Sequence, residues 1–129
     1  MVERSRIDPV YRKTLRDYRQ SSIRAVYSWN NCIVHLMEVN AFLAKDLLLF
    51  KVEWVNTTGF GIYLNARQLG LSVSGHAMRI VTSMQNSPDS WVLPGQMDTL
   101  WLVVQGERAA YLNPWVLTFP PGQAEAHNR

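Results

Sequence analysis

The chain has 129 residues, of which 47% are hydrophobic and 18% are charged, and its formal net charge is +3. These values are typical of one globular domain with a core of its own, and no apolar run approaches the ~20 residues that a membrane-spanning helix needs. The single cysteine, Cys32, excludes an internal disulfide and a cysteine-based metal site, and we interpret it as a small residue at the start of a strand.

A short amphipathic helix is predicted near the N-terminus. Asp8 can cap the free N–H groups of a helix, and the proline that follows it suits the first helical position. Tyr11, Leu15 and Tyr18 follow at spacings of four and three, which places them on one face. We expect the helix to end near residues 21–22 and to be marginal in isolation, so its apolar stripe must rest on the domain or on a partner.

Basic residues give this N-terminal arm its charge. Residues 1–24 carry seven Arg or Lys and three Asp or Glu, a balance of +4 that leaves −1 for the rest of the chain. The arm is either a solvated helix face or a docking element for nucleic acid, anionic lipid or an acidic partner. Tyrosines among the basic residues can stack on single-stranded bases, although the slightly acidic remainder argues against a nucleic-acid groove on the domain. The candidate partner-binding residues are Tyr11, Arg12, Leu15, Arg16, Tyr18 and Arg19.

The next two segments are less regular. Residues 23–29 fit either an extension of the helix or an extended lead-in. Residues 32–44 predict a strand, with a short amphipathic helix as the competing interpretation. Strict alternation along this strand places Val39 on the same side as His35 and on the side opposite Leu36.

Residues 47–55 give the clearest strand pattern in the chain. Every second residue is apolar, so this face should meet the core, while Lys51 and Glu53 should face water. The core-facing set is Leu48, Phe50, Val52 and Trp54.

Turn and strand patterns then follow each other to the C-terminus. Leu100, Leu102 and Val104 should share one face of their strand. The further strands are expected at residues 61–73, 76–84, 97–105 and 115–119, separated by turns or loops at 56–59, 74–75, 85–90, 94–95 and 105–108.

The fold class predicted from this spacing is mainly β, an immunoglobulin-like antiparallel β-sandwich of about seven strands preceded by a short amphipathic N-terminal helix. The expected division is a basic helical arm at residues 1–30, the sandwich domain at 31–119 and a flexible tail at 120–129.

No residue pattern predicts catalysis. His35, His76 and His127 are far apart and none has metal-binding spacing, so we expect no metal site. The acidic residues of the domain, Asp98 among them, fall mostly at turns or water-facing positions and are interpreted as solvated surface. Gly59–Gly61 lacks the strand and helix context of a nucleotide-binding loop, and no serine lies in a nucleophile elbow. We expect no enzyme activity, no catalytic residue and no cofactor.

Four segments in the middle of the chain carry a family resemblance. They are AFLAKDLLLF at 41–50, VNTT at 55–58, IYL at 62–64 and residues 69–73. In their order, and over roughly half of the chain, the sequence resembles the TraN-type conjugative transfer proteins, counterparts of the β-sandwich component of the type IV secretion core complex. The resemblance implies a non-enzymatic, envelope-located subunit that oligomerises and binds neighbouring subunits through strand edges and its N-terminal arm.

The function expected from these observations is a structural, protein–protein interaction subunit of a larger assembly such as a secretion or conjugation apparatus. Exposed edge strands are the second candidate binding element, because unpaired edges accept partner strands. One alternative is a nucleic-acid-binding accessory protein that uses the arm, and another is a phage or virion structural protein. No transmembrane segment is expected. For a chain that is a fragment of an exported protein, the resemblance to TraN-type proteins implies a location in the cell envelope or periplasm.

Overall fold

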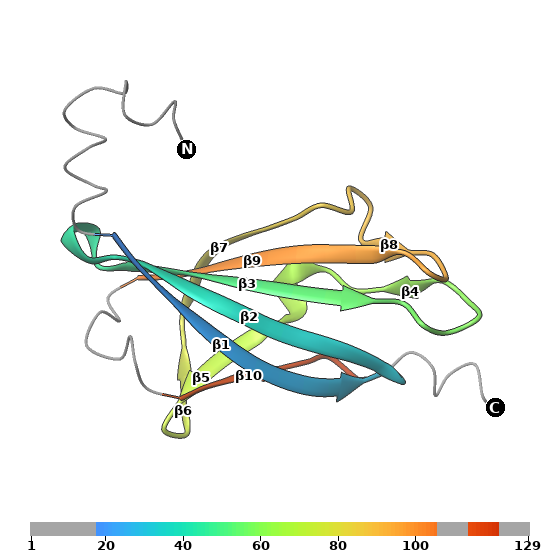
Figure 1. Ribbon diagram of the computed structural model, residues 1–129, viewed down its shortest axis with the longest axis horizontal. Coiled ribbons are helices and arrows are strands. Elements are labelled where there is room, and N and C mark those ends of the chain that lie inside the picture. The colour runs from blue at the N-terminus through green and yellow to red at the C-terminus, as the bar shows by residue number, and fades with distance from the viewer. Residues whose placement is uncertain (1–17, 106–113, 122–129) are drawn as a thin grey trace.

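The structure, a computed structural model, describes residues 18–105 and 114–121 and is mainly β in that part (Figure 1). Two short 3-10 helices, η2 (Leu43–Lys45) and η3 (Ala66–Gln68), interrupt the strands. No helix in these ranges is long and apolar enough to cross a membrane. The strands are β1 (Tyr18–Trp29), β2 (Cys32–Phe42), β3 (Leu47–Val55), β4 (Ile62–Tyr63), β5 (Gly70–Val73), β6 (His76–Met78), β7 (Ile80–Gln85), β8 (Trp91–Val92), β9 (Met97–Gln105) and β10 (Trp115–Thr118).

The strands form two facing layers, as in a β-sandwich (Figure 1). One layer is a five-stranded antiparallel sheet in the order β1-β2-β3-β9-β7, and the other is a three-stranded sheet in the order β10-β5-β6. The strands β4 and β8 pair separately as a two-stranded ribbon. Phe50 of β3 and Trp115 of β10 meet between the layers with ring centroids 4.8 Å apart, so the core lies between the two sheets.

The strands β3 and β9 confirm the clearest patterns of the sequence, including their bounds. The expected core-facing residues of both strands are fully buried because the two strands lie side by side in the centre of the five-stranded sheet. On the outer face, Lys51 and Glu53 form an ion pair at 3.4 Å, and Lys51 also lies 5.4 Å from the ring centroid of Trp101.

The alternation predicted for β2 is wrong beyond Leu36. The register against β3 shifts between Leu36 and Glu38, which marks a β-bulge. A bulge inserts one extra residue and moves every later side chain to the opposite face. Val39, expected opposite Leu36, is therefore buried with it in the same core, whereas His35 is exposed.

The helix predicted for the arm is wrong over residues 18–22, which belong to β1. This strand pairs with β2 from Tyr18 opposite Phe42 to Trp29 opposite Cys32. The backbone hydrogen bonds to β2 hold these residues in a strand although the spacing of their apolar side chains fits a helix. Contacts of this kind outweigh the local preference of a short segment. The five-stranded sheet thus begins within the range assigned to the arm. The remaining helix residues, residues 106–108 of the turn expected after β9 and residues 122–129 of the expected tail lie outside the described residues.

One predicted strand divides between the two layers. Residues 76–84 were expected to form a single strand, but the pairing changes at Arg79. Before this residue β6 belongs to the three-stranded sheet, and after it β7 forms an edge of the five-stranded sheet. The expected strand at residues 61–73 is likewise interrupted by η3. These two interruptions place η3 beside β7.

Two turn predictions are confirmed. Ser74 and Gly75 link β5 to β6 with φ angles of 52° and 81°, as a two-residue hairpin turn of type I′ requires. Gly95, which precedes β9, has a φ angle of 82°. Glycine suits both turns because it adopts positive φ without steric cost.

Candidate functional site

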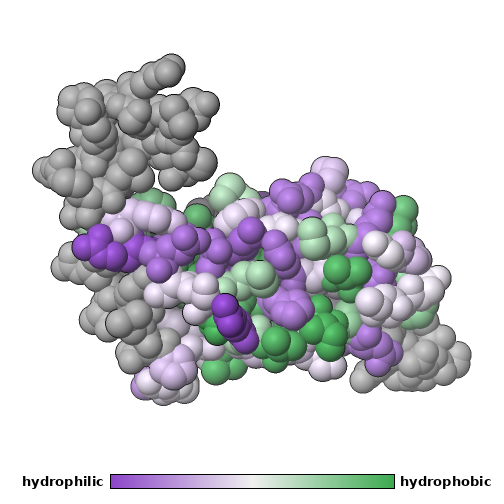
Figure 2. All heavy atoms as spheres, viewed as in Figure 1, coloured by the Kyte–Doolittle hydropathy of each residue, from purple (hydrophilic) through white to green (hydrophobic). Residues whose placement is uncertain are grey.

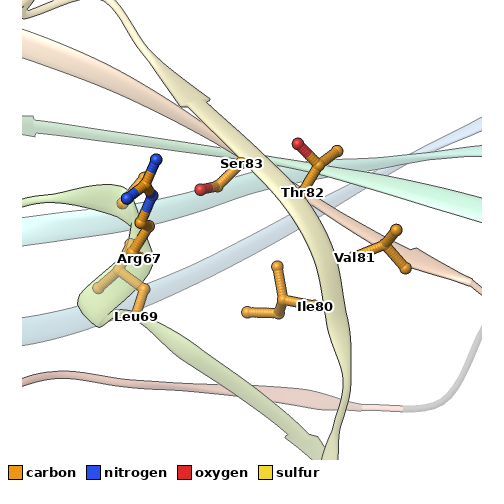
Figure 3. Close-up of a pocket in the computed structure, with 7 residues that line it drawn as sticks. Arg67, Leu69, Ile80, Val81, Thr82 and Ser83 are labelled. Carbon is orange, nitrogen blue, oxygen red and sulfur yellow. The ribbon is translucent and has the colours of Figure 1, made fainter.

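A hollow of about 360 Å³ lies between β7 and η3, on the side of the molecule where β7 is the edge of its sheet (Figure 3). Figure 3 shows Ile80 and Ser83 pointing from β7 toward η3, with Arg67 and Leu69 on the opposite wall. The side chains of residues 81–82 point away from η3. The hollow therefore opens between the two layers beneath the edge strand.

Gln85 holds η3 in place beside β7. Its side-chain oxygen accepts a hydrogen bond from the N–H of Ala66 at 2.9 Å. Its amide nitrogen donates to the carbonyl of Leu64 at 3.0 Å and to a carboxylate oxygen of Asp98 at 3.1 Å. These bonds join the last residue of β7 to the start of the segment that forms the opposite wall.

Asp98 supports this arrangement from β9. Its side chain is only 1% exposed, so its interpretation as solvated surface is wrong. The other carboxylate oxygen accepts from the N–H groups of Ser87 at 2.8 Å and Thr99 at 2.9 Å. Hydrogen bonds from neutral donors satisfy the buried carboxylate, and they also fix the loop that follows β7.

A capping box shapes η3 itself. The side-chain oxygen of Asn65 accepts from the N–H of Arg67 at 2.9 Å, and the side-chain oxygen of Gln68 accepts from the N–H of Asn65 at 3.0 Å. Reciprocal bonds of this kind satisfy the free donors at the start of a helix. They fix the backbone from which the Arg67 side chain extends.

The outer edge of β7 presents unpaired peptide groups. The N–H of Asn86 donates to the carbonyl of Thr99 at 3.0 Å, so this pair is a hydrogen-bonded pair of the antiparallel ladder. Such pairs alternate along the strand, and the peptide groups of Ser83 and Gln85 accordingly face away from β9. Within the described residues no backbone hydrogen bond joins β7 to η3. Among the described residues no further strand pairs with this edge, which has one register shift, between Ile80 and Thr82.

The chemistry of the hollow is mixed. Arg67 is exposed, it is the charged residue among those that line the hollow, and its guanidinium makes no ion pair within the described ranges. Leu69 and Ile80 supply apolar surface, and Ser83 supplies a hydroxyl group. The arrangement can hold an apolar side chain and a carboxylate next to an edge that offers backbone hydrogen bonds.

A second surface lies on the outer face of the five-stranded sheet. Ile33, Val55 and Met97 form a row across β2, β3 and β9, and their exposed fractions are 50%, 37% and 59%. They border a shallow hollow of about 290 Å³ together with His35 and Glu53. Figure 2 shows hydrophobic side chains over the end of the molecule where β2 begins and β3 ends. Exposed apolar surface of this kind is typical of contact sites.

The opposite edge, β1, is less suited to pairing. Its register against β2 shifts between Ser22 and Ala25, and Arg24 between them has a φ angle of 61°. Bulges of this kind bend an edge strand and hinder the addition of another strand. A carbonyl and an N–H of β10 also bond to the Tyr27 hydroxyl, at 3.4 Å and 3.0 Å, so this side of the two layers is closed.

Two of the predicted partner-binding residues lie in the described part. Tyr18 is half-buried, donates its hydroxyl to the side chain of Asn40 and lies 5.1 Å from Phe42 between ring centroids. Arg19 is exposed and donates to the carbonyl of Tyr18 at 2.8 Å. The binding role of both residues stays a prediction. The other predicted residues, Tyr11, Arg12, Leu15 and Arg16, lie outside the described residues.

Within residues 18–105 and 114–121, no group of three His, Cys, Asp or Glu side chains is placed to hold a metal ion. His35 lies on the outer face of β2, and His76 is exposed at the start of β6. Cys32 is buried at the first residue of β2, as expected. His127 lies outside the described residues.

Sequence reasoning did not single out the residues that line the hollow. Arg67 and Leu69 lay in a stretch expected to be a strand, and Ile80 and Ser83 lay in a strand not expected to change sheets. One local signal was available, because an Asn followed three positions later by Gln is the spacing of a capping box. It could have indicated η3, but not what η3 faces.

No protein-family model matches the chain, and no curated protein matches it. Among solved structures, the chain is similar to a functionally unknown protein from Listeria monocytogenes EGD-e, with 9% sequence identity and a TM-score of 0.49. The similarity covers 83% of this chain and 89% of that one.

Proposed function

We propose that this chain is a protein–protein interaction subunit of a larger assembly, without catalytic activity of its own, and that it binds a partner protein along β7. The observation that carries the proposal is the unpaired outer edge of β7 beside a hollow of about 360 Å³. A partner strand gains affinity from main-chain hydrogen bonds at such an edge and specificity from pockets for alternate side chains.

The two edges of the five-stranded sheet differ in a way that supports this assignment. The bulge beside Arg24 and the contacts of Tyr27 with β10 hinder strand addition at β1. The strand β7 also has a register shift, between Ile80 and Thr82, but it lies at the first residues of the strand, and the other end of the strand is held by Gln85. An edge that is held in place by hydrogen bonds is the better receptor because less order must be gained on binding.

The finer assignments belong to the same proposal. One of them is an immunoglobulin-like topology for the two layers, with which the facing antiparallel sheets are compatible. The other is a place in the secretion or conjugation apparatus that the TraN resemblance implies. The apolar row of Ile33, Val55 and Met97 offers a second contact surface, as a subunit with several neighbours needs.

Site-specific photocrosslinking in the cells from which the chain comes tests the proposal. A photoreactive amino acid replaces Val81 on β7, and the matched control replaces Val116 on β10, because the two valines are 47% and 48% exposed. We expect a covalent adduct with a partner protein from position 81 and none with that partner from position 116. Recovery of the monomer alone from position 81, or of adducts with nucleic acid only, contradicts the proposal.

A further inference from the structure

We infer, on the basis of the proposed function, that the occupant of the β7 edge is an extended acidic segment of a partner protein. It adds to the five-stranded sheet as a sixth strand beside β7. One of its carboxylates lies against Arg67, and an apolar side chain lies between Leu69 and Ile80.

The period of a β-strand selects which residues of this segment enter the hollow. Successive side chains of an added strand point to opposite faces of the sheet, so residues two positions apart share a face and are about 7 Å apart. Ile80 and Ser83 of β7 both point toward η3, although they are three positions apart, because the strand has a register shift between Ile80 and Thr82. An added strand would direct every second residue to that same side. The hollow of about 360 Å³ is small and suits one or two side chains.

The charge of the hollow determines which side chains of the added strand it favours. Among the described residues that line the hollow there is no carboxylate, and Arg67 carries the charge. A planar guanidinium matches a carboxylate through paired N–H donors, whereas a lysine in the added strand would meet like charge. Leu69 is buried and Ile80 half-buried, so the other end of the hollow favours an apolar side chain. The recognised pattern is an apolar residue two positions from an Asp or Glu.

Binding of synthetic peptides tests the pattern on the full chain. Three fluorescent eight-residue peptides of alternating Thr and Val carry Leu-Thr-Glu, Leu-Thr-Gln or Leu-Thr-Lys at the centre, and anisotropy gives their dissociation constants. We expect the Glu peptide to bind about fivefold more tightly than the Gln peptide, which is the size of a solvent-accessible ion pair, and the Lys peptide to bind least. Equal affinities, or no binding of any peptide at about 1 mM, overturn the inference.

Protein variants show whether Arg67 is the cause of the preference. Arg67→Glu should invert the order, so that the Lys peptide binds most tightly. Arg24→Glu is the matched control, because it makes the same charge change on an exposed residue of the opposite edge, and it should leave the order unchanged. An Arg67→Glu variant that still prefers the Glu peptide, with the circular dichroism spectrum of the native chain, overturns the assignment of this residue.

Peptide backbone methylation separates strand addition from simple charge attraction. The Glu peptide is methylated at alternate amide nitrogens, first at one set and then at the other, which changes neither its charge nor its side chains. Only one set of amides faces β7 in an added strand, so one methylated peptide should lose binding and the other should keep it. Two methylated peptides that bind equally well contradict strand addition.

The two proposals fail in different ways. If position 81 crosslinks to a partner but the peptides show no preference for Glu, the chemistry inferred for the segment is wrong and the binding function stands. If position 81 gives no partner, the function proposed for β7 is wrong and the inference falls with it.

Discussion

Asp98 shows how single residues hold the candidate site. Its carboxylate is 1% exposed and accepts hydrogen bonds from the side chain of Gln85 and from two backbone N–H groups. A buried carboxyl group is retained in the interior only where hydrogen bonds replace its hydration. The residue therefore stabilises the end of β7, and through Gln85 it also stabilises η3.

Asp98→Asn should lower the free energy of unfolding by about 1–3 kcal/mol, because the new amide would place a donor against the donor of Gln85 in a buried site. Urea denaturation measures the change. The control is Asp89→Asn, since an asparagine there keeps the oxygen that accepts from the N–H of Trp91 at 3.0 Å. Its effect should stay within about 0.5 kcal/mol. Equal unfolding midpoints for the two variants would show that the Asp98 carboxylate does not stabilise the fold in this way.

At the scale of elements, the pairing of β5 with β10 depends on close approach at one position. Gly70 lies opposite Thr118, and a Cβ atom on Gly70 would lie 2.5 Å from the hydroxyl oxygen of Thr118. The next nearest atom, the Cβ of Thr118, would be 3.9 Å away, which is an ordinary contact. The constraint therefore comes from one hydroxyl group.

Gly70→Ala should destabilise the protein by about 1 kcal/mol, because the exposed side chain of Thr118 must leave its rotamer to make room for the new methyl group. Thr118→Ala removes the hydroxyl, so the double variant should recover most of that loss. Thermal unfolding followed by circular dichroism measures all three variants. A double variant no more stable than Gly70→Ala alone contradicts the steric explanation, because the two effects would then simply add.

The molecule as a whole is closed on one side and open on the other. At the β1 side, Tyr27 bonds to β10 through its hydroxyl, and the indole N–H of Trp29 donates to the carbonyl of Pro120 at 2.8 Å. At the β7 side, the two layers are joined through Arg79, where the chain passes from one sheet to the other, and the hollow lies beside the edge strand. Under the proposed function, this asymmetry directs a partner strand to β7.

Tyr27→Phe should lower the free energy of unfolding by about 1–2 kcal/mol, because it leaves the N–H of Leu117 without its acceptor. Hydrogen exchange should also show a local effect. The amides of β10 should exchange faster than the decrease in global stability alone explains. Amides in the centre of β9 serve as the internal control, since they should change only with global stability. Identical changes in β9 and β10 would show that the Tyr27 hydroxyl does not close the two layers.

Patterns that depend on local alternation were predictable from the sequence. Residues 47–55 and 97–105 lie side by side in the centre of a sheet, so their burial follows the period of two without interruption. The turn at residues 74–75 was predictable for a similar reason, because the residue types that tolerate positive φ are few.

The bulge after Leu36, the strand at residues 18–29 and the division of the chain at Arg79 depend on which strands pair. Strand pairing is decided by contacts between segments far apart in the sequence, and the local alternation of apolar and polar residues does not reveal these contacts. The sequence by itself determined a mainly β domain and the core faces of its central strands, because the alternation of apolar residues is a local property. Only the tertiary structure decided that Arg67 faces Ser83 beside an open edge, because that meeting requires η3 and β7 to lie on opposite sides of the gap between the two layers.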